Sequence, residues 1–233
     1  MEIRVLFFCL IGLNVLTASA QDLPHAYQAT HKMKAVIKTT AVVYDDSLIY
    51  EKCAMKANKK MLAAMNKEQM TTIYFNEEHF VAVERLNASF GPTLTFFDYQ
   101  RGVEIRLEDE ISKTGRLQPL NERRSIPGAL SWELTNKSVK VNGYTTRLAE
   151  GSRASRMGEE FGRAWLVERD LFPAHVLPNL PLAQELGLVI VKQTTNSTTQ
   201  CLQRVVNYSL SKVEKINKTF DLQDWTFDVP ETA

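Results

Sequence analysis

The chain has 233 residues, a net charge of +1 and 44% hydrophobic residues. This combination excludes a disordered chain, and 28 basic against 27 acidic residues exclude a protein that binds mainly to nucleic-acid phosphates. Ten Gly and eight Pro are too few for a collagen-like or low-complexity chain.

The first 20 residues have the features of a secretory signal peptide. Arg4 precedes the apolar run Val5–Leu16, and the small residues Ala18–Ala20 follow it, so cleavage is expected before Gln21. The run is too short to span a membrane, and no later segment is apolar enough to do so. Cys9 lies inside the run without the context of a lipid anchor. We therefore expect 21–233 to form one domain in the periplasm or outside the cell, with no transmembrane segment.

Two cysteines remain after cleavage. In an oxidising compartment Cys53 and Cys201 can form a disulfide. The alternative is two buried thiols that pack as small hydrophobic residues. Their spacing fits no metal site.

Most of the remaining chain is predicted to form strands. The segments rich in alternating or β-branched residues are 34–44, 79–85, 93–99, 103–108, 138–142, 144–148, 162–169, 188–194 and 202–213. Hairpin turns are predicted at 100–102, at Asn142-Gly143 and at Asn196-Ser197. The short spacing of the strands predicts a mainly β (α+β) fold with one antiparallel sheet, and excludes the strand–helix alternation of a dinucleotide-binding fold.

One helix is predicted over 54–67. This segment has no Gly, Pro or β-branched residue, and Met61 and Met65 fall on its apolar face with Ala54, Ala57 and Leu62. It either packs on the sheet with its lysines in water or covers an apolar groove as an adaptable lid, because Met side chains are flexible and polarizable. Its basic face also suits contact with an anionic lipid surface.

Two segments are predicted to be irregular. The polar, Gly-containing segment 150–163 is expected to be an exposed loop. The three prolines of 172–181 indicate a stiff apolar connection that lies against the core.

The sequence contains no recognised catalytic, phosphate-binding or metal-binding motif, and its four histidines are scattered, so no enzyme, cofactor or metal is predicted. Asn-x-Ser/Thr triplets begin at Asn87, Asn136, Asn196, Asn207 and Asn217. They matter only in a host that glycosylates asparagine during secretion, and such short patterns also arise by chance.

Three blocks of the chain resemble the GLPGLI family of exported proteins, which is common in the Bacteroidetes. They are Phe97-Asp98-Tyr99-Gln100-Arg101, Trp132 followed by Lys137-Ser138-Val139-Lys140-Val141-Asn142-Gly143-Tyr144, and Arg163-Ala164-Trp165. The family in turn resembles the lipoprotein-carrier (LolA-like) half-barrels. The resemblance covers roughly 30–225 and implies a curved, half-barrel-like sheet with the helix packed on or over its concave face.

These features predict a non-enzymatic envelope protein that binds or carries an apolar ligand such as a lipid or acyl chain. One helix and one connection cover only part of such a sheet, so the remainder can form a ligand cavity. The predicted lining is Met61, Met65, Phe96 and Trp165. The alternative is a structural or interaction protein with a filled core that docks another envelope protein. Neither interpretation involves nucleic acid.

Overall fold

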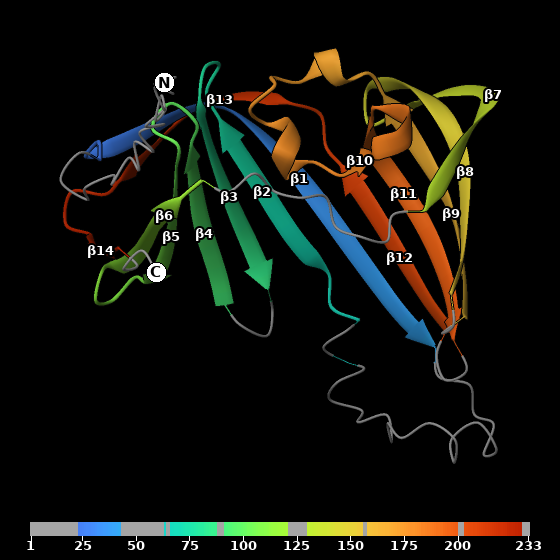
Figure 1. The fold of residues 1–233 in the computed structure, drawn as a ribbon, viewed down its shortest axis with the longest axis horizontal. Helices are drawn as coiled ribbons and strands as arrows, with labels where there is room; N and C mark the ends of the chain where they lie inside the picture. The colour runs from blue at the N-terminus through green and yellow to red at the C-terminus, as the bar shows by residue number, and fades with distance from the viewer. Residues whose placement is uncertain are drawn as a thin grey trace, which may run out of the picture.

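The structure is a computed structural model, and it describes residues 23–42, 63, 66–87, 91–120, 130–155, 158–199 and 203–229. These residues form one large mixed sheet that does not close (Figure 1). Its strands are β1 (Ala26–Val42), β2 (Gln69–Phe75), β3 (Phe80–Asn87), β4 (Gly91–Asp98), β5 (Val103–Asp109), β6 (Thr114–Pro119), β7 (Ser131–Val141), β8 (Tyr144–Ser155), β9 (Gly158–Val167), β10 (Leu182–Ala183), β11 (Leu188–Thr199), β12 (Gln203–Leu210), β13 (Glu214–Asp221) and β14 (Thr226–Asp228).

The sheet is organised around β1, which runs diagonally through the molecule in Figure 1. The strand order is β14-β6-β5-β4-β3-β2-β1-β12-β11-β9-β8-β7, with β10 beside β11. One edge of β1 pairs with β2. Its other edge is shared, because Ala26–Lys32 pairs with β13 and Ala35–Val42 pairs with β12.

The predicted mainly β fold is confirmed, with several corrections to the strands. The sheet is mixed and not purely antiparallel, because β14 pairs with β6 in parallel. The segment 150–163 is not a loop, since most of it lies in the long antiparallel strands β8 and β9. Asn196 and Ser197 do not form a turn but lie inside β11, where they pair with both β9 and β12.

Two predicted hairpin turns are confirmed. Asn142 and Gly143 join β7 to β8 with φ angles of 51° and 85°, the left-handed conformation that Asn and Gly adopt most readily. The turn around 100–102 joins β4 to β5, and Gly102 has a φ of 66°.

Both faces of the sheet are buried around β2, β3 and β4. Neighbouring residues in a strand point to opposite faces, so Val81 and Val83 pack in one cluster while Phe80 and Ala82 pack in another. The first cluster is covered by the connection between β9 and β11, which contributes Phe172, Val176, Leu177 and Leu180. The prediction that 172–181 lies against the core is therefore confirmed. A third cluster lies at the β7 end of the sheet.

The helices of the described residues are three short 3₁₀ turns at Arg169–Leu171, Leu177–Asn179 and Gln184–Leu186. None of the helices in this part of the chain is long and apolar enough to cross a membrane. The predicted helix over 54–67 lies outside the described residues except for Ala63, Asn66 and Lys67, and so do Met61, Met65, Cys53 and Cys201.

Candidate functional site

The structure places the two described residues of the predicted lining far apart in the sheet. Phe96 lies on β4 and Trp165 on β9, with β3, β2, β1, β12 and β11 between them. Phe96 has no exposed surface, and its ring centroid lies 5.8 Å from that of Tyr27 and 5.3 Å from that of Phe220. Phe96 is therefore part of a filled aromatic core and does not share a site with Trp165.

Trp165 lines an open hollow of about 470 Å³ over β8, β9 and β11, here called the Trp165 hollow. Its lining residues are Glu150, Gly151, Phe161, Gly162, Arg163, Trp165, Thr194 and Asn196. The Lys192 ammonium lies 4.9 Å from the centroid of the Trp165 ring. An ion pair of 3.0 Å joins Arg163 Nε to Glu150 Oε1. Aromatic rings between charged and hydroxyl side chains suit an amphipathic or polyhydroxylated molecule better than an acyl chain alone.

A second candidate site lies on the opposite face of β11, because alternate residues of a strand point to opposite faces. Gln193 and Thr195 lie there, and across β12 they are paired with Tyr208 and Val206. Tyr208 and Val206 are in turn paired with Ile37 and Thr39 of β1. These six residues form one patch across three strands, here called the Tyr208 strip.

The hydroxyl of Tyr208 is buried and has no hydrogen-bond partner among the residues that the structure describes. Burial, and to a lesser degree Tyr144, raises the pKa of Tyr208, so the hydroxyl keeps its proton and remains a donor. The ring packs between the clusters that contain Leu210 and Leu166. Thr39 and Thr195 are also buried, with 5% and 3% of their surface exposed. The Tyr208 strip thus combines apolar surroundings with one hydroxyl whose proton no described residue accepts.

Trp132 lies at the β7 end of the sheet face that carries the Tyr208 strip. A Cβ atom at Gly162 would lie 2.7 Å from Leu130 Cδ1 and 3.0 Å from Trp132 Cη2, and one at Gly151 would lie 2.7 Å from Trp132 Cε3. The two glycines are paired between β8 and β9. Their lack of side chains allows the indole ring to lie directly on the two strands.

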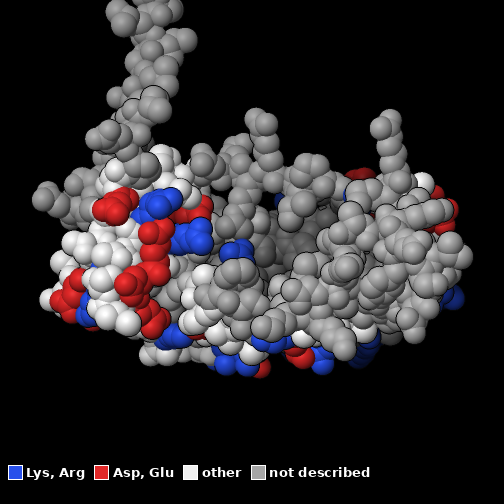
Figure 2. Space-filling model, turned by 90° about the horizontal axis from the view of Figure 1, so that it is seen from below, with Lys and Arg blue, Asp and Glu red and all other residues white. Residues whose placement is uncertain are grey.

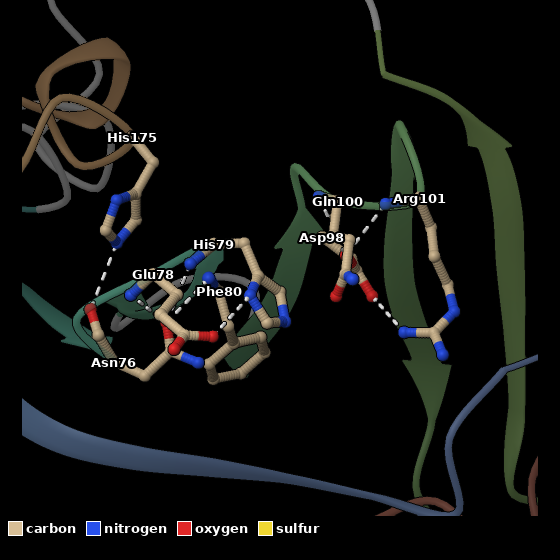
Figure 3. Close-up of polar contacts among 8 residues, drawn as sticks. All are labelled: Asn76, Glu78, His79, Phe80, Asp98, Gln100, Arg101 and His175. Atoms are coloured by element: carbon tan, nitrogen blue, oxygen red, sulfur yellow. Dashed lines mark hydrogen bonds and ion pairs between the residues drawn. The ribbon is translucent and has the colours of Figure 1, made fainter.

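Several polar side chains form hydrogen bonds with the backbone of the β2–β3 and β4–β5 turns (Figure 3). Asn76 Oδ1 accepts hydrogen bonds from the backbone N–H groups of Glu78, His79 and Phe80. His175 Nε2 lies 3.0 Å from the Asn76 carbonyl oxygen, and burial lowers the pKa of His175. These acceptors are used by the chain itself, so the group does not resemble a catalytic site.

Asp98 plays the corresponding role at the β4–β5 turn. Its Oδ1 accepts hydrogen bonds from the backbone N–H groups of Gln100 and Arg101, and its Oδ2 from the Tyr27 hydroxyl and the Arg101 guanidinium. Four donors satisfy this fully buried carboxylate. The residues that the structure describes contain no group of three or more side chains able to hold a metal ion.

Acidic and basic side chains alternate on the described part of the surface in Figure 2. Ion pairs such as Lys113–Asp224 at 2.7 Å and Arg116–Glu108 at 3.4 Å join neighbours of opposite sign. On the face shown in Figure 2, the described residues thus carry charges of both signs, unlike the continuous basic patch of nucleic-acid-binding surfaces.

A scan against protein-family models and a search of curated proteins each found no match for the chain. The resemblance to the GLPGLI family therefore remains a prediction from the sequence.

The Tyr208 strip was not predicted from the sequence. The sequence predicts one strand over 202–213, whereas β12 ends at Leu210 and the next strand, β13, pairs with another part of β1. The available signal was a tyrosine in an alternating strand, which is equally typical of a solvent-facing residue.

Proposed function

We propose that the protein is an exported, non-enzymatic binding protein that holds an apolar ligand, such as a lipid or acyl chain, against the Tyr208 strip. The observation that supports this proposal is the buried hydroxyl of Tyr208, for which the described part of the chain offers no hydrogen-bond partner. An unpaired buried hydroxyl costs about 1–3 kcal/mol. A ligand that places an acceptor oxygen beside the hydroxyl removes this cost, and its free energy of binding becomes more favourable by the same amount.

The surroundings of the hydroxyl favour a ligand with a long apolar part. Ile37 and Val206 flank Tyr208 along the strip, and Leu166, Ala164 and Trp132 continue the apolar surface across β9 and towards β7. Ligand sites of this kind combine an apolar lining with few polar groups that orient the ligand. In this proposal the helix over 54–67 is the lid, with Met61 and Met65 facing the ligand, and the curved sheet is half-barrel-like.

The proposal revises the predicted lining in two positions. Phe96 is assigned to the aromatic core, and Trp165 lies on the opposite sheet face, outside the Tyr208 strip. The resemblance to the GLPGLI family and to lipoprotein-carrier half-barrels is part of the proposal, and it points to the same class of ligand.

The test is titration of the purified protein with a fluorescent fatty acid, combined with native mass spectrometry and urea unfolding. Tyr208→Phe removes the unpaired hydroxyl, so the variant is expected to be about 1 kcal/mol more stable than the wild type. Its affinity for the probe should fall about 5- to 10-fold, the equivalent of one hydrogen bond. Trp165→Ala, on the opposite face, is the matched control and should bind the probe with unchanged affinity.

A Tyr208→Phe variant that is more stable yet binds equally well would contradict the role of the hydroxyl. If the affinity falls instead in Trp165→Ala, the ligand occupies the Trp165 hollow. A wild-type protein that shows neither saturable binding nor a co-purified lipid overturns the proposal as a whole.

The second candidate is an interaction protein of the envelope, and the edge strand β7 favours it. β7 is the last strand of the sheet on its side, and it exposes 39% of Leu134 and 42% of Val139. An exposed strand edge with apolar side chains can accept a strand from a partner. This candidate replaces the first if the wild-type protein fails the probe titration.

A further inference from the structure

Asn-x-Ser/Thr triplets are more frequent in this chain than its composition explains. Residues 21–233 contain 11 asparagines, and five of them begin such a triplet. Ser and Thr make up 29 of these 213 residues, so about 1.5 triplets are expected by chance. The excess indicates that at least some of the triplets have a role, which in an exported chain is the attachment of an N-linked glycan.

The structure shows how far the fold uses the side chain of each described asparagine. Outside the triplets, Asn76 caps three backbone N–H groups, and Asn142 donates to Ser209 and to the carbonyl of Leu210. Inside the triplets, Asn136 and Asn196 have exposed side chains. Two other triplet asparagines are used by the fold, because Asn207 Oδ1 accepts from the Thr194 hydroxyl and Asn217 Oδ1 from the Gln28 amide. Asn136 and Asn196 are exposed and accessible to modification.

Asn196 has a second feature that points to a ligand. It is paired with Phe161 of β9, and both side chains line the Trp165 hollow. Side chains directly opposite each other on neighbouring strands lie about 5 Å apart at their Cβ atoms. The Phe161 ring is 53% exposed, which is unusual for a large aromatic side chain in the middle of a sheet face. An apolar ring beside the acceptor amide gives a surface on which a sugar ring can pack.

We infer that Asn196 carries an N-linked glycan whose first sugars lie in the Trp165 hollow against Phe161. A bond forms between Nδ2 of Asn196 and the anomeric carbon of the first sugar. The bond between that carbon and the diphosphate oxygen of a lipid-linked oligosaccharide donor breaks, the lipid diphosphate leaves with the electron pair, and Nδ2 loses one proton. Thr198 supplies the hydroxyl that the acceptor triplet requires.

The other residues of the hollow fit a sugar. Arg163 and Glu150 hold each other as an ion pair and provide further donors and acceptors, and Thr194 adds a hydroxyl. The volume of about 470 Å³ lies within the range of small-molecule sites. The inference rests on the export that forms part of the proposed function, but it concerns the sheet face opposite the Tyr208 strip.

The full chain, with residues 1–20, is to be secreted from mammalian cells and compared with the same chain produced in a bacterium without the glycosylation pathway. Intact mass, release by peptide N-glycosidase and peptide mapping identify the occupied asparagines. A glycan is expected at Asn196, and the Asn196→Gln variant should lose it. A secreted wild-type chain that is unmodified at Asn196 overturns the inference alone. A chain that is never secreted overturns both the inference and the export.

A double-mutant cycle tests the contact between the glycan and Phe161. In the glycosylated protein, Phe161→Ala should lower Tm by about 2–4 °C more than it does in the Asn196→Gln background. In bacterial protein, which lacks the glycan, this difference should vanish. Asn136→Gln is the matched control, because Asn136 lies in the irregular part of the edge strand β7 and has no paired aromatic residue. Equal Tm changes in all backgrounds would show that the glycan does not pack on Phe161.

Discussion

Replacing the buried Asp98 by alanine should destabilise the protein more than any other single change at a turn. The carboxylate is fully buried and accepts four hydrogen bonds of 2.9–3.1 Å. Removing one member of a buried charged pair costs about 3–5 kcal/mol. The Arg101 side chain is 39% exposed and can regain hydration, so the expected loss is near the lower limit, about 3 kcal/mol.

Urea unfolding followed by tryptophan fluorescence measures this loss. Because m is about 1–3 kcal/mol/M, the midpoint of Asp98→Ala should fall by about 1 M or more without a change in m. Tyr27→Phe removes only one of the four donors and should lose about 1 kcal/mol. Asp109→Ala removes a similar turn-capping carboxylate at an exposed site and should leave the midpoint almost unchanged. If Asp98→Ala behaves like Asp109→Ala, the carboxylate does not stabilise the turn as argued.

Gly162→Ala should lower the free energy of unfolding by about 1–3 kcal/mol, because the new methyl group would lie 2.7 Å from Leu130 Cδ1 and 3.0 Å from Trp132 Cη2; an unchanged unfolding curve would contradict this packing. Asn76→Ala leaves three backbone N–H groups without their acceptor and should cost about 1–2 kcal/mol, seen also as faster amide exchange between β2 and β3. Burial lowers the pKa of His175, so the unfolded chain binds a proton at higher pH than the folded chain does. Stability should therefore decrease as the pH falls through about 6.5, and His175→Gln should weaken this dependence.

The strands that could be predicted from the sequence are those with one buried and one exposed face. In β5, Val103 and Ile105 are buried whereas Arg106 is exposed, and the alternation of Ile105 and Leu107 predicts the strand 103–108. The turn at Asn142-Gly143 was predictable because few other residues adopt positive φ at two successive positions. Here local sequence and tertiary structure agree.

β2, the second half of β8 and the first part of β9 were not predicted, because they lack these local signals. β2 reads Gln-Met-Thr-Thr-Ile-Tyr-Phe and is buried on both faces near its end, so its apolar residues do not alternate. β8 and β9 contain Gly151 and Gly162, which sequence rules assign to loops, but the glycines are present because the Trp132 ring lies on them. This contact joins segments that are distant in the sequence, so local sequence patterns do not reveal it.

The candidate site was even less accessible to prediction. The sequence places Trp165 in the predicted lining, but nothing in it shows which of the two sheet faces a residue of β9 occupies. A bulge between Ile190 and Lys192 shifts the register of β11 against β9. One inserted residue reverses the faces of all residues beyond it, which is why Thr195 is buried and Asn196 is exposed.

The shared edge of β1 determines when the protein can fold. Lys34 is hydrogen-bonded to Ser211 and Gln28 to Asn217, so the partners of the first strand lie 177 and 189 residues later in the chain. During synthesis from the N-terminus β1 has only β2 on one side, and its other edge stays unpaired until β12 and β13 have been made. Sheets built on such distant pairings form slowly. A nascent chain of this kind exposes an unpaired strand edge until its last strands have been made, and until then it is prone to aggregation.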